Sequence, residues 1–189
     1  MKIFYLALLL LSVGHVSNAQ QTRKPYGYKR LPLVENKVVY TGVVVAPCIS
    51  QQVLFERARQ WLAQTIISGP DTARTRNREA GMLVAHGLLN QPPIGAFKDP
   101  NSYTYDCTIY VRDGKYKYQI DRFQWAYSTM TLTGTVARGP FTSPLEQLGT
   151  LPNNYYTEDR AGYVDEQMKA LISSLEATLA PHSAADLTW

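Results

Sequence analysis

The stretch that decides the fold is residues 107–120, CTIYVRDGKYKYQI, where apolar and polar side chains alternate on both sides of Asp113-Gly114. An Asp-Gly pair between two alternating runs predicts a two-residue β-hairpin with a type I′ turn. The predicted cross-strand pairs are Arg112–Lys115, Val111–Tyr116, Ile109–Tyr118 and Cys107–Ile120. In this register the apolar members of the pairs share one face, and the polar residues Thr108, Lys117 and Gln119 lie on the other. The hairpin is therefore expected to bury one face of a sheet.

The sequence on both sides of this hairpin predicts further strands and the loops between them. The hairpin strands are expected to extend over Tyr103 to Ala126. β-Branched, aromatic or continuous apolar runs predict more strands at Lys37 to Val45, Ala80 to Leu89 and Thr129 to Val136. Polar or Gly- and Pro-rich stretches predict a surface loop over Thr72 to Arg78, a loop over Asn90 to Asn101 and a long irregular segment over Arg138 to Arg160.

Two segments predict amphipathic helices. In the first, Ser50 can cap the N-terminus, and apolar residues recur at helical spacing from Leu54 onward until Ser68-Gly69-Pro70-Asp71. The second carries one apolar stripe from Val164 to Leu179. The resulting order, β-α-β-β-β-β-α, predicts an α+β fold with an antiparallel sheet and two helices packed on one face. The two helices are the only cover available for the apolar face of the sheet.

The N-terminus has the parts of a secretory signal peptide. Lys2 precedes an apolar run from Ile3 to Leu11, which is too short to span a bilayer and makes a membrane anchor the weaker alternative. Small residues lie at Ser17 and Ala19, so we expect a signal peptide over residues 1–19, cleaved between Ala19 and Gln20. No cysteine follows the apolar run closely enough for lipid attachment. The sequence thus predicts an exported, non-lipidated protein, periplasmic or secreted, without stable membrane insertion after the signal is removed.

The length of the mature chain corresponds to one domain. We expect this domain over residues 31–180, between a flexible basic lead-in at residues 20–30 and a loose tail at residues 181–189. The basic residues of the lead-in are either a solvated linker or a weak attraction for an anionic membrane or envelope polymer. The formal net charge of +4, which includes Lys2, is too small to indicate a nucleic-acid-binding protein.

Three segments resemble a family of exported domains of unknown function from Gram-negative bacteria, which have a TBP-like fold. They are residues 31–40, residues 55–61 (FERARQW) and residues 109–116 (IYVRDGKY). The resemblance covers roughly Leu31 to Ala126 and implies the antiparallel sheet with two helices on one face. It implies no established activity and no catalytic residues. The chain departs from the family at Thr72 to Arg78, which is polar where members have a strand-like stretch, and at Ala46-Pro47-Cys48, where a small residue is usual in place of the cysteine.

The two cysteines, Cys48 and Cys107, are candidates for a disulfide, because exported proteins with an even number of cysteines often form them. The alternative is two separate thiols. The family resemblance implies that the first strand lies next to the last one, away from the central hairpin that contains Cys107. This arrangement disfavours the bond, which needs Cα atoms about 5–6 Å apart.

No catalytic or cofactor motif is present, and we expect neither a metal site nor a cofactor. His86 shares a strand face with apolar residues. This position is more typical of a structural histidine with its hydrogen bonds satisfied than of a catalytic base or a metal ligand. Asp106 and Asp121 are expected to lie opposite each other in the hairpin. The chain contains 13 tyrosines, and Tyr110 should point outward. Together with Tyr155, Tyr156 and His86 it is a candidate for a binding surface, although ordinary strand composition explains the tyrosines too.

Three functions remain open from the sequence. The first is a non-enzymatic envelope module that binds a protein or polymer through one face of the sheet. The second is a carrier of an apolar small molecule between sheet and helices. The third and weakest is a hydrolase built around His86, which requires that the imidazole reach solvent and contact a carboxylate or a hydroxyl.

Overall fold

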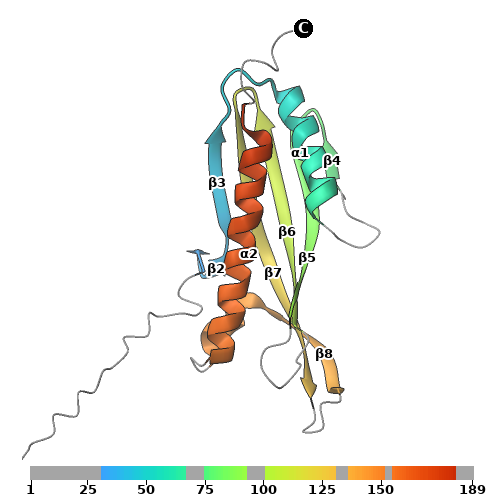
Figure 1. The fold of residues 1–189 in the computed structure, drawn as a ribbon, viewed down its shortest axis with the longest axis vertical. Helices are drawn as coiled ribbons and strands as arrows, with labels where there is room; N and C mark the ends of the chain where they lie inside the picture. The colour runs from blue at the N-terminus through green and yellow to red at the C-terminus, as the bar shows by residue number, and fades with distance from the viewer. Residues whose placement is uncertain (1–30, 67–74, 93–100, 131–135, 152–154, 182–189) are drawn as a thin grey trace, which may run out of the picture.

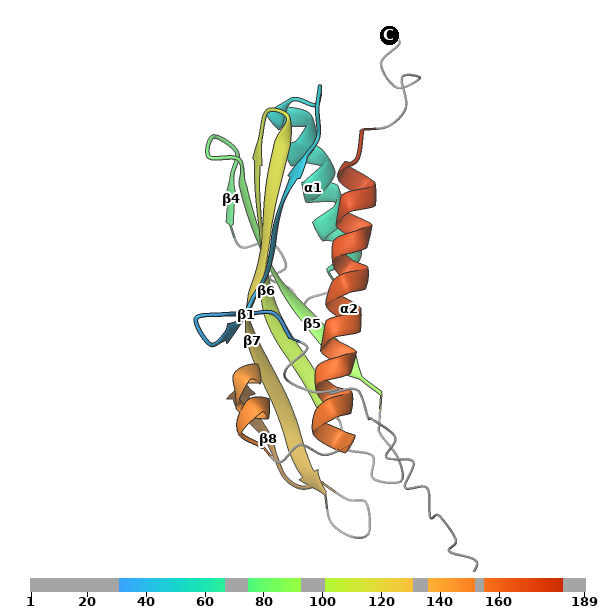
Figure 2. The same cartoon turned by 90° about the vertical axis from the view of Figure 1, so that its left-hand side faces the viewer.

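The computed structural model describes residues 31–66, 75–92, 101–130, 136–151 and 155–181. The expected signal peptide and its cleavage site, the basic lead-in and most of the predicted tail lie outside the described residues. Two helices, α1 (Gln51–Thr65) and α2 (Tyr155–Leu179), pack on one face of an antiparallel sheet (Figures 1 and 2). The predicted α+β fold with both helices on one side of the sheet is confirmed. Neither described helix is sufficiently long and apolar to cross a membrane.

The main sheet has six strands among the described residues, in the order β3-β7-β6-β5-β4, with β8 pairing with β7. Every described pairing is antiparallel. The strands are β3 (Tyr40–Val45), β4 (Thr75–Asn77), β5 (Met82–Gln91), β6 (Asn101–Arg112), β7 (Lys115–Met130) and β8 (Val136–Pro144). A small separate ladder joins β1 (Leu33–Val34) to β2 (Lys37–Val38), and the 3₁₀ helix η2 (Leu145–Thr150) follows β8.

The predicted hairpin register is confirmed, because β6 and β7 pair Val111 with Tyr116 and Cys107 with Ile120. The predicted turn type is wrong. Type I′ requires positive φ at both turn residues, and of the two only Gly114 has it, at 71°. Positive φ at two successive turn residues occurs instead between β1 and β2, at Glu35 (50°) and Asn36 (63°). The predicted strand Lys37 to Val45 joins β2 and β3 into one, and β1 was not predicted.

Three predicted boundaries are corrected by the structure. The expected surface loop over Thr72 to Arg78 contains the edge strand β4, whose polar residues pair with β5 through backbone hydrogen bonds that need no apolar side chains. The expected strand Thr129 to Val136 is divided between the end of β7 and the start of β8, and residues 131–135 are outside the described part. The segment Arg138 to Arg160 is not one irregular stretch, because it contains most of β8, all of η2 and the start of α2.

The first strand of the main sheet also has a different neighbour from the one implied by the family resemblance. β3 pairs directly with β7, the second strand of the central hairpin, in the register Gly42↔Tyr118. β8 extends the sheet on the same side of β7 farther along, in the register Trp125↔Ser143. The long strand β7 therefore joins β6 on one side to two shorter strands on the other.

Aromatic rings fill the layer between the sheet and the helices. Phe123 is fully buried, stacks on Tyr105 with ring centroids 5.8 Å apart, and meets Tyr40 edge-on at 5.9 Å. Two of the rings lie over glycines of the neighbouring strand: a Cβ atom added at Gly87 would overlap the ring of Tyr105, and one added at Gly42 would overlap the ring of Tyr118. These two positions require glycine because a large cross-strand ring occupies the space of a side chain.

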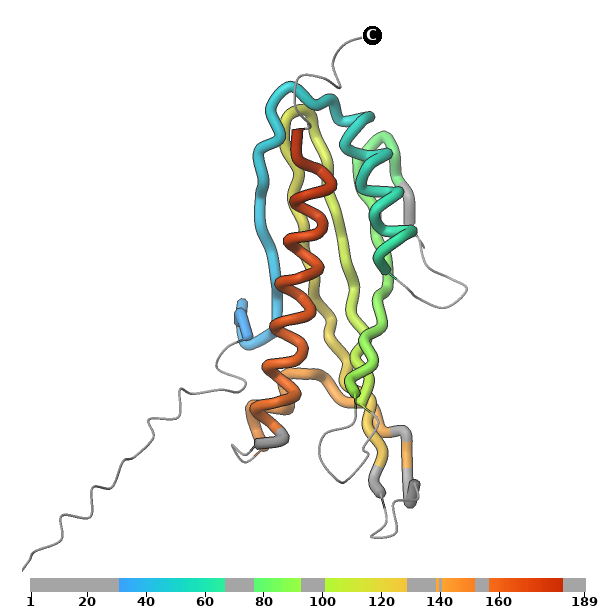
Figure 3. The backbone as a smooth tube through the Cα atoms, viewed as in Figure 1, coloured from blue at the N-terminus to red at the C-terminus, as the bar shows by residue number. Residues whose placement is uncertain are grey.

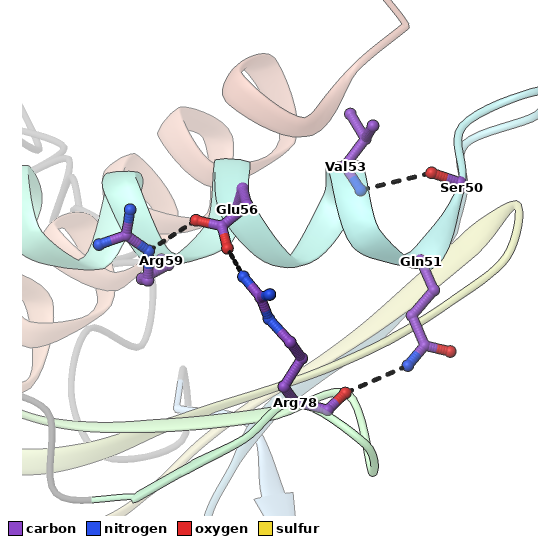
Figure 4. A network of polar contacts seen from close by, with 6 residues as sticks. All are labelled: Ser50, Gln51, Val53, Glu56, Arg59 and Arg78. Atoms are coloured by element: carbon purple, nitrogen blue, oxygen red, sulfur yellow. Dashed lines mark hydrogen bonds and ion pairs between the residues drawn. The ribbon is translucent and has the colours of Figure 1, made fainter.

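Polar contacts fix α1 to the sheet (Figure 4). The Ser50 hydroxyl accepts a hydrogen bond from the Val53 amide, as expected of the N-cap. Glu56, in the second turn, accepts from Arg59 at 2.7 Å and also pairs with Arg78 in the turn between β4 and β5. The hydrogen bond from Arg59 lowers the pKa of Glu56. Gln51 contributes a further contact, through its side-chain amide to the Arg78 carbonyl oxygen.

Candidate functional site on the open face of the sheet

The face of the sheet that points away from α1 and α2 is here called the open face (Figure 2). Strand pairing arranges its side chains in rows across the sheet. One row contains Val43, Lys117, Tyr110 and Met82, from β3, β7, β6 and β5 in turn. A row farther from the hairpin turn contains His86 opposite Asp106, which is itself opposite Asp121. The predicted opposition of Asp106 and Asp121 is therefore present.

The rows nearest the hairpin turn combine apolar and basic side chains. Val43 is 66% exposed, Val45 is 71% exposed and Tyr110 is 41% exposed. Tyr110 points outward, as the alternation predicted. Together with the basic residues Arg112, Lys115 and Lys117, these three define what we call the basic–apolar patch.

A pocket of about 380 Å³ opens within this patch. Arg112, Lys115 and Lys117 line it beside Val43 and Tyr110, and none of its described lining residues is acidic. Three cations around apolar walls make an environment that favours a ligand with both carboxylate and apolar groups.

Farther along the same face, a polar cluster surrounds Asp106. Its Oδ1 contacts Nδ1 of His86, and its Oδ2 accepts a hydrogen bond from Nε of Arg122 at 2.7 Å. The side chain of Asp106 is only 10% exposed, whereas that of His86 is 40% exposed. Asp121 lies 3.8 Å from Arg122 and accepts a hydrogen bond from Gln119 at 2.7 Å. Each carboxylate of the cluster is thus paired with at least one donor.

A β-bulge in β7 places Arg122 in this cluster. The register shifts between Thr104 and Asp106 on β6, so that β7 has one extra residue at this point, and Arg122 has φ of 54°. The extra residue leaves both Asp121 and Arg122 outside the covered face. The bulge was not predicted, although the sequence carries a signal for it: the buried apolar positions change from the even-numbered Tyr116, Tyr118 and Ile120 to the odd-numbered Phe123 and Trp125.

The polar cluster meets one part of the requirement for a hydrolase. His86 reaches solvent and contacts a carboxylate, as a general base with an orienting group would. No hydroxyl or thiol that could serve as a nucleophile is hydrogen-bonded to His86 among the described residues, and Asp106 is shared with Arg122. No group of three His, Cys, Asp or Glu residues in the described ranges is arranged to hold a metal ion.

The remaining predicted site residues do not join this face. Tyr155 and Tyr156 begin α2, which packs on the opposite face and starts at the end of the molecule farthest from the hairpin turn (Figure 1). Their side chains lie outside the described residues. The predicted surface that unites them with Tyr110 is therefore not supported by the position of α2.

The candidate disulfide is absent, and both cysteines are free thiols. Cys48 is exposed beyond the end of β3, next to the hairpin turn, where the Gly114 amide donates to the Ile49 carbonyl oxygen. Cys107 is buried on β6, about 20 Å along the strand from that turn. Burial raises the pKa of the Cys107 thiol to about 12.

Comparisons with known proteins agree with this architecture. Residues 40–126 match the model of a family described as a domain of unknown function (DUF4468) with TBP-like fold. Two crystal structures are similar: a DUF4468 family protein from Bacteroides ovatus, with a TM-score of 0.61 and 14% identity over 84% of this chain and 95% of that one, and a TBP-like protein from Parabacteroides distasonis, with a TM-score of 0.59 and 13% identity over 77% and 97%. At these identities the two structures show the shared fold alone. No curated protein matches the chain significantly.

Proposed function

We propose that this protein, whose residues 40–126 belong to the DUF4468 family with a TBP-like fold, is an exported, non-enzymatic binding module of the cell envelope. It holds an acidic partner protein on the open face of its sheet. The observation that carries this proposal is the basic–apolar patch, where Val43, Val45 and Tyr110 are exposed among three cations.

The composition of the patch supports a protein partner over a polysaccharide. Apolar side chains exposed together on an otherwise polar face are typical of interaction sites, and tyrosine and arginine are the residues that most often dominate binding energy. Val43 and Val45 offer exposed aliphatic contact area that a sugar polymer matches poorly. Arg112, Lys115 and Lys117 favour carboxylates and disfavour basic partners, because like charges brought together cost binding energy.

The two alternatives have less support. A hydrolase at His86 lacks a nucleophile that is hydrogen-bonded to the imidazole among the described residues. A carrier of an apolar molecule needs space between sheet and helices, and there the rings of Tyr103, Tyr105 and Phe123 are buried in the core. The pocket described above opens on the other side of the sheet.

Photo-crosslinking in the host tests the proposal. A photoreactive residue replaces Val43 in the patch, and a control protein carries it in place of Val53, which is 43% exposed on α1. We expect a crosslinked protein from position 43 and not from position 53. Mass spectrometry should identify an acidic segment in the crosslinked protein.

Charge reversal makes the test specific. The double variant Lys115→Glu, Lys117→Glu should lose the crosslink from position 43 while its circular dichroism and thermal unfolding stay unchanged. A crosslink to a different protein that survives the double reversal, or that forms equally from position 53, would overturn the proposal, and a crosslink to a second copy of this chain does not count as a partner.

The export step has its own test. Expression of the full chain in a Gram-negative host should place the protein in the periplasm or the medium with Gln20 at its N-terminus. Intact-mass measurement and N-terminal sequencing give this result directly. Full-length protein recovered from the cytoplasm would contradict export.

A further inference from the structure

The structure assigns a second interaction surface: we propose that the outer edge of β3, which pairs with no other strand among the described residues, is the interface of a two-fold symmetric homodimer, in which β3 pairs antiparallel with β3 of a second copy. The inference goes beyond the binding role of the open face, since it rests on the backbone of one strand. Figures 1 and 3 show β3 at the margin of the sheet, with the β1–β2 hairpin beyond its lower end among the described elements.

The direction of the backbone N–H and C=O groups shows which of them are available for pairing at this edge. In an antiparallel ladder, successive residues direct their N–H and C=O groups alternately toward the two sides of the strand. The Ala46 amide donates to Gly114 on the β7 side, whereas the Val39 amide donates to Pro32, away from β7. By this alternation Thr41, Val43 and Val45 direct their N–H and C=O groups away from β7, toward the outer edge.

β3, β4 and β8 lie at margins of the sheet in the described residues, and they differ in how well they resist pairing. Natural sheets protect their edges with short strands, charged residues, prolines or bulges. β4 is three residues long and contains Arg76. β8 contains Arg138 and Pro140, and its pairing with β7 is interrupted by register shifts. β3 has the sequence YTGVVV, with none of these features and no register shift in its pairing with β7.

A second copy fits this edge better than a charged partner does. Two identical antiparallel strands with Val43 at the two-fold axis would pair Val43 with Val43 and Thr41 with Val45. This register uses all three residues whose polar groups face outward. No charged side chain of β3 meets its own copy, so the repulsion that normally opposes self-pairing of identical strands is absent. The exposed side chain of Val43 would lie opposite the apolar Val43 of the second copy, and Val45 would lie opposite Thr41.

Measurement of molecular mass in solution tests the inference on the mature chain, Gln20 to Trp189. Sedimentation velocity and light scattering should show a dimer whose population rises with protein concentration. Val43→Lys places two like charges at the axis and should weaken dimerisation by roughly tenfold or more, since each factor of ten corresponds to about 1.4 kcal/mol. Val53→Lys adds the same charge on α1 and should leave the dimer intact. Val43→Pro removes an outward-facing N–H and should weaken the dimer as well.

A crosslinking variant keeps the test decisive if a lysine or proline at this position prevents folding. In a Cys48→Ser background, Val43→Cys should form a disulfide-linked dimer under mild oxidation, and Val53→Cys should not. The inference would be overturned if the chain stays monomeric at high concentration and this crosslink does not form. That result is also expected if residues 20–30 of the same chain cover the edge. A dimer that persists unchanged in Val43→Lys and Val43→Pro would overturn it equally.

Discussion

The two faces of the β6–β7 hairpin are held by different interactions. On the covered face, aromatic rings such as Tyr105 and Phe123 pack on one another and on glycines of neighbouring strands. On the open face, Asp106 is held by contacts with His86 and Arg122, and the rows nearer the turn carry exposed Val43 and Tyr110 among cations. Shape and burial constrain the first face, whereas the second is free to present charge and apolar groups to a partner.

This difference predicts where substitutions cost stability and where they cost only binding. Cavities and overpacking are expensive in a buried aromatic layer. On an exposed face the same kinds of change usually alter stability by no more than about 0.5 kcal/mol.

The largest expected effect comes from truncating the buried aromatic layer. Phe123→Ala removes a fully buried ring that contacts Tyr105 and Tyr40, and should lower the free energy of unfolding by about 3–5 kcal/mol. Tyr110→Ala on the open face of the same hairpin should lower it by no more than about 1 kcal/mol. Urea unfolding followed by circular dichroism measures both values. Equal losses would show that the two faces do not differ as described.

A smaller effect is expected from filling a glycine position on the covered face. Gly87→Ala forces the ring of Tyr105 to move and should cost about 1–3 kcal/mol. Gly162→Ala is the matched control, because a Cβ at this position of α2 has nothing within 4 Å. The control should stabilise the protein by up to about 1 kcal/mol, since alanine is the better helix former. Thermal unfolding measures both variants. If both were more stable than the wild type, Gly87 would not be required to make room for the ring of Tyr105.

Two single-hydroxyl deletions sharpen the comparison within the covered layer. The Tyr40 hydroxyl donates to the buried Asp165 carboxylate at 3.1 Å, so Tyr40→Phe should cost about 1–2 kcal/mol. The Tyr116 hydroxyl is buried without a hydrogen-bond partner among the described residues, so Tyr116→Phe should be neutral or stabilise by up to about 1 kcal/mol. Chemical denaturation distinguishes the two, and a larger loss for Tyr116→Phe would contradict the assigned contacts.

The smallest expected effect is a dependence of stability on alkaline pH. Burial, together with nearby Glu176 and Tyr118, raises the pKa of Tyr116 to about 12, whereas an unfolded tyrosine titrates near 10. Between these values the unfolded chain binds fewer protons than the folded one, so the free energy of unfolding falls as pH rises. Urea unfolding at about pH 9 and pH 11 should show a smaller fall for Tyr116→Phe than for the wild type. Identical falls would exclude Tyr116 as a contributor.

The alternation in residues 107–120 was enough to predict the hairpin register, because a shift of one residue would move every apolar side chain to the wrong face. The polar strand β4 was not predictable in this way. Its three residues form a strand because β5 offers backbone partners, not because of their own side chains. The bulge at Arg122 lies between these cases: the change of apolar parity signals an extra residue, but only pairing with β6 shows where the arginine is directed.

Four features were predictable from the sequence alone, because periodic burial is a local property of the chain: the α+β class, the hairpin register, the two amphipathic helices and the outward direction of Tyr110. Only the three-dimensional arrangement shows that Arg122 meets Asp106, that Val43 and Lys117 share a pocket with Tyr110, and that β3 lies at a margin of the described sheet. These relations depend on which strands become neighbours. The order of neighbouring strands is set by the packing of the whole sheet against α1 and α2, and a local pattern of residues does not indicate that order.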